Sequence, residues 1–131
     1  TGKKAVVIGR SPVVGKPAAM MLLQKNATVT ICHTKTTDMP SVVKEADIVI
    51  VAAGRAGVID AKYLRAGQTV IDVGINVNEE DKLCGDVNFA DAEPVVDAIT
   101  PVPGGVGSVT TSVLIEHVVD AALLKAGLDI L

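Results

Sequence analysis

The sequence alternates short runs of β-branched residues with stretches of helix-forming residues, and this alternation constrains the fold more than any other feature. The apolar runs are continuous, which is typical of strands that are covered on both faces. Strand–helix–strand repetition implies a parallel sheet with right-handed crossovers. We therefore predict one doubly wound, Rossmann-like α/β domain over residues 1–131. It has strands at 4–9, 27–32, 47–53, 69–74 and 98–100, and helical segments at 17–25, 39–45, 61–64 and 110–125.

Composition narrows the classes of function. The chain has 131 residues, enough for one core, and only 2% of them are aromatic, which argues against a site that stacks nucleic-acid bases on rings. No uninterrupted apolar run reaches the length of a membrane span, and the N-terminus does not resemble a signal peptide. Cys32 and Cys84 are too few for a disulfide framework, so we expect free thiols in a reducing compartment. No cysteine or histidine cluster has metal-ligand spacing, and we expect no metal site.

The charges are distributed unevenly. The net charge is −3, yet residues 1–37 hold six lysines and arginines and no acid. A positive first third on an acidic chain favours a small phosphorylated ligand over a nucleic acid, which would need a basic surface throughout. Chance clustering of solvated lysines is the alternative explanation.

A glycine-containing loop joins the first strand to the first helix, from Gly9 to Gly15. Gly9 allows a tight turn, and Gly15 at the helix entrance lets backbone N–H groups approach a phosphate. The spacing differs from G-x-G-x-x-G because Ser11 replaces the middle glycine and the loop is one residue longer. An ordinary turn with a helix-capping Ser11 is the alternative.

The end of the second strand lacks an acidic residue. Folds that bind NAD place an Asp or Glu about 20 residues after the first glycine, on the ribose hydroxyls. Here the window reads Cys32-His33-Thr34-Lys35, with no acid before Asp38. A 2′-phosphate would be attracted by Arg10, Thr34 and Lys35, so we predict NADP over NAD if the ligand is a dinucleotide. We interpret His33 as a polar strand-end residue and not as a catalyst.

A second loop, Thr100 to Thr110, combines two prolines with three glycines. Proline fixes φ and glycine permits conformations that other residues avoid, so the loop is stiff and sharply turned. It follows a strand, where open α/β sheets bind ligands, although it could serve topology alone. We expect Ser108 or Thr110 to cap the last helix and Gly127 to end it.

Smaller features occur after the third and fourth strands. Ala53 and Gly54 put small residues at the edge of the cleft, where a flat cofactor could lie against the backbone. Asp72 is either a hydrogen-bond acceptor in the cleft or a buried, satisfied side chain. Residues 75–94 read as irregular with a small hairpin near Cys84, and Gly85-Asp86 reads as a simple turn.

The last helix is unusually apolar, because a surface helix normally keeps a polar side. Its stripe comprises Val113, Leu114, Ile115, Val118, Val119, Ala121, Ala122, Leu123 and Leu124. Either the helix is buried within the fold, or it packs on something outside these 131 residues. We favour the second interpretation.

Taken in order, these blocks resemble one family. VVIGRSPVVGKPAAM, ATVTICHTKT, ADIVIVAAG, TVIDVGIN, GDV and ITPVPGGVG are similar to the C-terminal NAD(P)-binding domain of bifunctional 5,10-methylenetetrahydrofolate dehydrogenase/methenyltetrahydrofolate cyclohydrolase. That family oxidises methylenetetrahydrofolate by hydride transfer to NADP and hydrolyses the product to 10-formyltetrahydrofolate. The resemblance implies a cytoplasmic, homodimeric parent enzyme of one-carbon metabolism and purine biosynthesis, with no nucleic-acid or membrane partner.

The resemblance also implies a set of binding residues. The cofactor set is Gly9, Arg10, Ser11, Val14, Gly15, Thr34, Ala53, Gly54, Ile75 and Thr110. The loop expected to face the folate is Pro103, Gly104, Gly105, Val106 and Gly107.

The chain departs from the family at several points. Thr34 stands where the family has Ser, and Ser108-Val109 stands where it has Pro-Met. The family's Tyr-x-x-x-Lys pair belongs to an N-terminal folate domain, and Tyr63 cannot replace it because Gly67 lies four residues on. We therefore expect no catalytic residue in this chain, which would be one half of an enzyme and inactive alone.

Two alternative functions stay open from the sequence. The chain could be a non-catalytic NADP-sensing or assembly module, in which case the Pro- and Gly-rich loop has no evident purpose. It could also be the cofactor domain of another two-domain NADP dehydrogenase, acting on an amino acid or shikimate. The blocks IDVGIN and PVPGGVG speak against this last reading.

Overall fold

The structure, a computed structural model, describes residues 1–128 and has the expected α/β architecture. Five parallel strands form one sheet in the order β2 (Thr28–Cys32), β1 (Lys4–Ile8), β3 (Ile48–Val51), β4 (Thr69–Asp72) and β7 (Ala98–Ile99). The order reverses between β1 and β3, because the chain adds β2 on one side of β1 and the later strands on the other. Such a switch point leaves a crevice at the carboxyl edge of the sheet.

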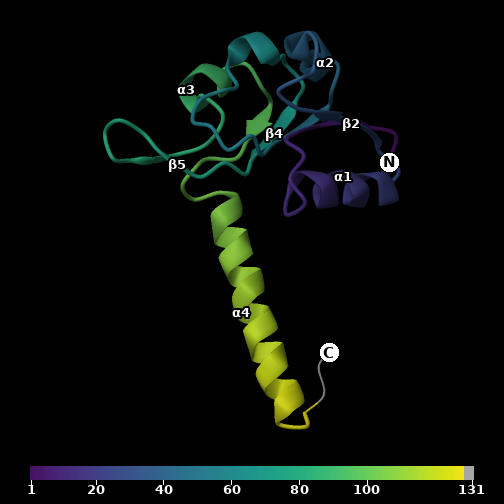
Figure 1. The fold of residues 1–131 in the computed structure, drawn as a ribbon, viewed down its shortest axis with the longest axis vertical. Coiled ribbons are helices and arrows are strands. Elements are labelled where there is room, and N and C mark those ends of the chain that lie inside the picture. The colour runs from purple at the N-terminus through teal and green to yellow at the C-terminus, as the bar shows by residue number, and fades with distance from the viewer. Residues whose placement is uncertain (129–131) are drawn as a thin grey trace.

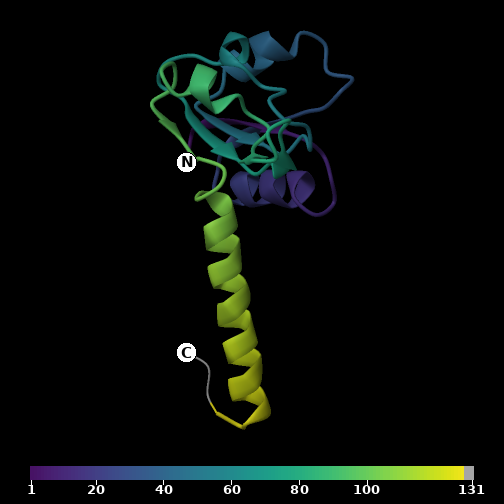
Figure 2. The ribbon, with the colours of Figure 1, turned by 90° about the vertical axis from the view of Figure 1, so that its left-hand side faces the viewer.

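Helices cover the two faces of the sheet unequally (Figures 1 and 2). One face carries α1 (Gly15–Gln24), and the other carries α2 (Met39–Lys44), the 3₁₀ turn η1 (Ala61–Tyr63) and α3 (Phe89–Ala92). Most of the core lies under this second group. Its buried residues are Val6, Ile8, Cys32, Val43, Ala46, Val49, Val51, Ile59, Leu64, Val70, Val87 and Ala92.

The prediction that every strand is covered on both faces is wrong in two places. Strand β2 forms an edge and exposes both of its threonines. On the other strands, α1 packs over Val7 of β1, but Ile48, Ile50 and Ile71 of the same face are only partly buried. An apolar sheet face normally requires a second layer, and α1 supplies it for only part of this sheet.

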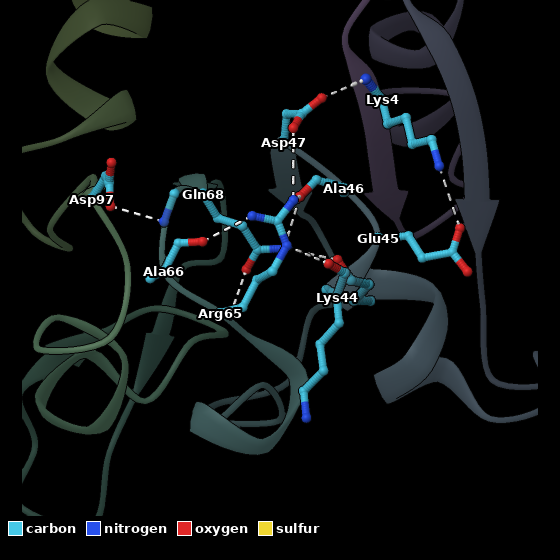
Figure 3. Close-up of polar contacts among 11 residues, drawn as sticks. Lys4, Lys44, Glu45, Ala46, Asp47, Arg65, Ala66, Gln68 and Asp97 are labelled. Atoms are coloured by element: carbon cyan, nitrogen blue, oxygen red, sulfur yellow. Dashed lines mark hydrogen bonds and ion pairs between the residues drawn. The ribbon is translucent and has the colours of Figure 1, made fainter.

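Two side chains join the end of α2 to the start of β4 at the amino edge of the sheet (Figure 3). The Arg65 guanidinium donates to the carbonyl oxygens of Lys44 at 2.6 Å and Ala46 at 2.9 Å, and it lies 3.6 Å from the Asp47 carboxylate. Gln68 is fully buried, and its amide donates to two carbonyl oxygens at the end of α2, at 2.8 and 3.0 Å. These bonds satisfy carbonyl groups that a helix leaves unpaired at its C-terminus.

Asp47 extends this network to β1. The hydrogen bond that its carboxylate accepts from the Lys4 N–H, at 2.9 Å, is the main reason that the pKa of Asp47 lies below its ordinary value, and the charges of Lys3 and Arg65 lower it further. Because this pKa is lower in the folded chain than in the unfolded chain, the carboxylate stabilises the fold above the ordinary pKa of Asp. The contribution is lost as the pH falls through the lowered value.

Most predicted elements are present within two residues of their expected bounds, including the hairpin of β5 (Asn76–Val77) and β6 (Leu83–Cys84). Helix α1 begins at Gly15, two residues early, so Pro17 falls in its first turn, where a missing N–H leaves no bond unmade. The prediction of irregular chain over 75–94 missed α3. This single turn of helix is too short to show a periodic pattern.

Helix α4 (Val106–Lys125) begins four residues earlier than predicted. The proposed caps are wrong, because Ser108 and Thr110 lie inside the helix. Ser108 donates its N–H to the Gly105 carbonyl at 3.2 Å, and the Thr110 hydroxyl donates to the Val106 carbonyl at 3.0 Å. Gly127, with φ of +73°, follows the end of the helix as predicted.

Helix α4 projects away from the sheet as a free arm (Figures 1 and 2). None of its residues is buried, and its apolar side chains surround the axis instead of following one stripe. With 20 residues and a mean hydropathy of 1.3 over its most apolar window, it is also long and apolar enough to cross a membrane, by length and composition alone. The sequence analysis did not identify this length and apolarity, because it looked for an uninterrupted apolar run and polar residues interrupt the helix.

Replacing Gln68 tests the contribution of the α2–β4 connection. The variant Gln68→Ala removes both amide donors and leaves the Arg65 N–H without the side-chain oxygen that accepts it at 2.8 Å. We expect the free energy of unfolding to fall by about 2–3 kcal/mol, the cost of an unpaired buried group together with a small cavity. Urea denaturation measures this change, and Gln24→Ala on the exposed surface of α1 is the control, expected to stay within about 0.5 kcal/mol.

Candidate functional site

The strands β1, β2, β3 and β4 end side by side at the carboxyl edge of the sheet, because their last residues are in register. Ile8 is in register with Cys32 on one side and with Val51 on the other, and Val51 is in register with Asp72. The segments 9–14, 33–36, 52–54 and 73–75 follow directly, with 100–105 beside them after β7. Most of the predicted binding residues lie in these segments, so the fold brings them together at the crevice.

The loop between β1 and α1 is built on backbone contacts that exclude side chains. Gly9 has φ of +120°, and a Cβ atom there would lie 2.2 Å from the carbonyl oxygen of Ala52. A Cβ atom at Gly15 would lie 2.3 Å from the carbonyl oxygen of Gly9. Both glycines are therefore required for the close approach that holds the start of α1 against the ends of β1 and β3.

Ser11 orders this loop and does not cap the helix. Its hydroxyl oxygen accepts the Val14 N–H at 3.0 Å, and its carbonyl accepts the Lys16 N–H at 3.0 Å. Val14 occupies the cap position of α1 and makes no side-chain capping bond. The first N–H groups of a helix lack intrahelical partners and its dipole favours negative charge, so this helix start, with exposed Arg10 beside it, suits a phosphate.

The connection after β2 is a hydrogen-bonded turn. The Thr36 hydroxyl accepts the His33 N–H at 2.8 Å, and the Lys35 N–H donates to Nδ1 of His33 at 3.2 Å. His33 is therefore engaged in holding the turn, which agrees with its interpretation as a strand-end residue. Thr34 and Lys35 are exposed at the tip, next to the glycine loop, which is tied to this strand by a bond from the Gly9 N–H to the Cys32 carbonyl at 2.9 Å.

Both cysteines are free thiols. Burial raises the pKa of the Cys32 thiol, although a hydrogen bond with Thr36 lowers it in part. A buried thiol with a raised pKa is a poor nucleophile, so Cys32 acts as a core residue beneath the turn.

The turn after β3 is held by a residue that the sequence analysis read as part of a simple turn. The Asp86 carboxylate is fully buried and accepts the N–H groups of Ala53 at 2.7 Å and Gly54 at 2.8 Å. It also accepts the side-chain amide of Asn76 at 2.9 Å, next to the exposed Ile75. The prediction that Gly85-Asp86 is only a turn is therefore wrong. The available signal was an acidic residue directly before the apolar Val87.

Asp72, at the end of β4, is a buried and satisfied carboxylate. It accepts the N–H groups of Gly74 at 2.9 Å, Asp86 at 3.1 Å and Val87 at 3.0 Å. Burial raises its pKa, these donors lower it, and the neighbouring charge of Asp86 raises it. Of the two readings left open from the sequence, the structural one holds, because the three bonds fix the connection after β6 against the sheet.

The loop after β7 makes a tight turn before α4. A Cβ atom at Gly105 would lie 2.3 Å from the Pro101 carbonyl oxygen, and Gly104 has φ of +94°. The loop residues Pro103, Gly104 and Gly105 lie at the crevice edge of the sheet, whereas Val106 and Gly107 form the first turn of α4. Thr110 lies further along the arm, with its hydroxyl bonded within the helix.

A hollow of about 300 Å³ opens beside the hairpin β5–β6, with Asp72, Cys84, Phe89 and Val102 in its lining. It includes none of the predicted cofactor residues. Within residues 1–128, no group of three His, Cys, Asp or Glu side chains is arranged to hold a metal ion.

Substitution of Gly15 tests whether the close backbone contact is required. In Gly15→Ala the new Cβ meets backbone atoms of Gly9 that cannot rotate away, so the loop must move. We expect a loss of about 1–3 kcal/mol in the free energy of unfolding, the usual cost of overpacking. Thermal unfolding measures it, with Gly107→Ala as the control, because no atom lies within 4 Å of a Cβ placed at Gly107 and its φ is not in the left-handed region. Equal stability of the two variants would contradict the contact.

Comparison with known proteins agrees with this arrangement. The sequence model of the tetrahydrofolate dehydrogenase/cyclohydrolase NAD(P)-binding domain matches residues 1–126. The "Bifunctional protein FolD" of Carboxydothermus hydrogenoformans is 58% identical over 129 residues, which are 97% of this chain and 45% of that protein. The protein of the same name from Clostridium botulinum strain Langeland is 60% identical over 121 residues, 92% of this chain and 43% of the relative. The chain thus spans less than half the length of these curated relatives.

Solved structures show the same fold. The bifunctional enzyme FolD from Campylobacter jejuni, a methylenetetrahydrofolate dehydrogenase/cyclohydrolase, superposes with a TM-score of 0.89 at 45% identity, over 95% of this chain and 44% of its own. The Trypanosoma brucei enzyme, solved in complex with NADP cofactor and inhibitor, gives a TM-score of 0.80 at 41% identity, over 88% of this chain and 41% of its own. The chain therefore belongs to the family of tetrahydrofolate dehydrogenase/cyclohydrolase NAD(P)-binding domains.

Proposed function

We propose that this chain is the cofactor half of a bifunctional enzyme. The enzyme oxidises 5,10-methylenetetrahydrofolate to 5,10-methenyltetrahydrofolate with NADP and hydrolyses the product to 10-formyltetrahydrofolate. The observation that carries the proposal is the pair of side-chain-free contacts at Gly9 and Gly15, in a chain whose relatives are named for this bifunctional enzyme. The family membership removes the reason to consider a dehydrogenase for amino acids or shikimate.

The described residues fit a dinucleotide. The Gly9 carbonyl occupies the space that a Cβ atom would need at Gly15, so the loop lies directly against the start of α1, which offers N–H groups to a diphosphate. We assign Gly9, Ser11, Val14 and Gly15 to the diphosphate and Arg10 to the 2′-phosphate. Ala53, Gly54 and Ile75 would line the nicotinamide half. When bound, the cofactor supplies a hydride acceptor, and this domain contributes binding and orientation.

We assign the preference for NADP to charge. The strand end after β2 carries no acid that would repel a 2′-phosphate, and Arg10 and Lys35 are exposed on neighbouring connections with Thr34. Thr34 is exposed on the turn that Thr36 holds, and it adds a hydroxyl to these two charges. Cationic side chains favour the phosphate through charge-assisted hydrogen bonds.

The folate side requires groups that this chain does not supply. We propose that Pro103, Gly104, Gly105, Val106 and Gly107 face the substrate and that the catalytic side chains belong to an N-terminal domain. The partly covered isoleucines of the α1 face and the apolar surface of α4 are where that domain and a second subunit would pack. Thr110, placed on the arm, would reach the cofactor only in that assembled enzyme.

The setting completes the proposal. We infer a cytoplasmic homodimer that serves one-carbon metabolism and purine biosynthesis, without a nucleic-acid or membrane partner. Free thiols are in keeping with a reducing compartment. Helix α4 carries the acidic Glu116 and Asp120 in its central part, and charged groups at such positions are costly in a bilayer. Covering by protein therefore explains its apolar surface better than covering by lipid.

Neutralising Arg10 tests the cofactor preference. In Arg10→Ala we expect NADP affinity to fall about tenfold, the loss that corresponds to one hydrogen bond to a charged group, while NAD affinity is unchanged. Isothermal titration calorimetry with each dinucleotide measures both. Lys25→Ala, which removes the same charge at the far end of α1, is the control and should bind NADP as the unchanged chain does. An equal loss for NADP and NAD would remove Arg10 from the 2′-phosphate.

Reconstitution tests the division of labour. We expect the 131-residue chain alone to show neither NADP reduction with methylenetetrahydrofolate nor hydrolysis of methenyltetrahydrofolate. Addition of a separately expressed N-terminal half from a relative should restore both activities, followed by absorbance of the reduced cofactor and of the methenyl group. Turnover by the chain alone would refute the assignment of chemistry to the other half. Binding of NADP with no restored activity would instead favour a non-catalytic module.

A further inference from the structure

Asp86 lies outside every segment assigned to the cofactor, yet it contacts Ala53 and Gly54 in one of them and Asn76, which directly follows another. One carboxylate oxygen accepts the N–H groups of Ala53 and Gly54, at 2.7 and 2.8 Å. The other accepts the Asn76 side-chain amide at 2.9 Å. The chain from β3 and the chain from β4 are thus joined through one side chain that belongs to neither.

The carboxylate fits this place closely. A Cβ atom at Gly74 would lie 2.3 Å from Cγ of Asp86, so the glycine after β4 leaves the room that the side chain occupies. The backbone of Asp86 is fixed as well, because its N–H donates to the Asp72 carboxylate at 3.1 Å. No cation pairs with Asp86 among the described residues, so three N–H donors compensate its charge. Hydrogen bonds to a carboxylate are roughly twice as strong as neutral ones, and they fix their donors in position.

The turn that Asp86 holds touches the glycine loop. Ala52, directly before the held residues, presents the carbonyl oxygen that leaves no room for a side chain at Gly9. On the other side, Asn76 follows Ile75, whose side chain is 73% exposed at the crevice. The held positions are those that the proposed function assigns to the nicotinamide half. The adenosine half is placed by the glycine loop and by the turn after β2, which Asp86 does not contact.

We propose that Asp86 is a positioning residue for the nicotinamide half of the cofactor, acting through the Ala53–Gly54 backbone and the Asn76 amide. This inference rests on the proposed function. It divides the binding site into two halves that different residues hold in position. The contacts of Asp86 position the nicotinamide half, and the glycine loop with Arg10 positions the adenosine half. Loss of the carboxylate should therefore affect one half and spare the other.

The test compares two ligands on the 131-residue chain. NADP reports both halves of the site, and adenosine 2′,5′-bisphosphate reports the adenosine half alone. In Asp86→Ala we expect NADP affinity to fall about tenfold, with no change for adenosine 2′,5′-bisphosphate. Asp86→Asn keeps one acceptor oxygen and should fall between the unchanged chain and Asp86→Ala. Asn76→Ala removes only one contact and should show a smaller loss, again for NADP alone.

The control removes a carboxylate with a comparable bond elsewhere. Asp97 accepts the Gly67 N–H at 2.8 Å at the opposite edge of the sheet (Figure 3), so Asp97→Ala should bind both ligands as the unchanged chain does. If Asp86→Ala does not fold, Asp86→Asn and Asn76→Ala carry the test. Unchanged NADP affinity in these variants, or a parallel loss of both ligands, would overturn the proposal. If the unchanged chain binds neither ligand, the proposed function fails, and the positioning role fails with it.

Discussion

The close approach of backbone to backbone at Gly9 and Gly15 is the constraint on which the rest of the structure depends. Gly9 contacts the carbonyl of Ala52, and Gly15 contacts the carbonyl of Gly9, so three successive pieces of main chain lie in mutual contact without a side chain between them. This contact fixes α1 against the ends of β1 and β3. It also fixes the start of α1 at the switch point of the sheet, where a helix terminus can meet an anion.

On the other side of the crevice, glycines also allow close contacts, but the nearest atoms belong to side chains and not to backbone. Gly74 and Gly85 also lack room for a Cβ atom, but their neighbours are the carboxylates of Asp86 and Asp72. The N–H groups that turn away from the parallel ladder after β3 and β4 need acceptors, and a buried carboxylate can accept several at once. Main-chain contact thus supports one side of the crevice, and buried carboxylates support the other. This explains how the short, irregular connections keep a defined shape.

What could be predicted from the sequence depended on how local each signal was. The strands and the loop from Gly9 to Gly15 were predicted because their apolar runs and glycines are consecutive. The role of Asp86 was missed because its partners lie 10, 32 and 33 residues away, and no local pattern records such bonds. The start of α4 was placed too late because Ser108 and Thr110 are good caps, but inside a helix their groups bond to the preceding turn equally well.

Helix α4 starts at the edge of the crevice and presents an exposed apolar surface. Its exposed large apolar residues retain 41–64% of their accessible surface, so each would gain part of the about 1.5–3 kcal/mol that full burial of an exposed side chain of this kind contributes. The direction of the arm is set at its first turn, where Gly105 contacts Pro101 and Gly104 adopts a positive φ. Because that turn lies at the crevice edge, a protein body that packs along α4 is held at a fixed distance from the glycine loop. The same turn therefore shapes the edge of the crevice and sets the direction of the apolar surface that α4 presents.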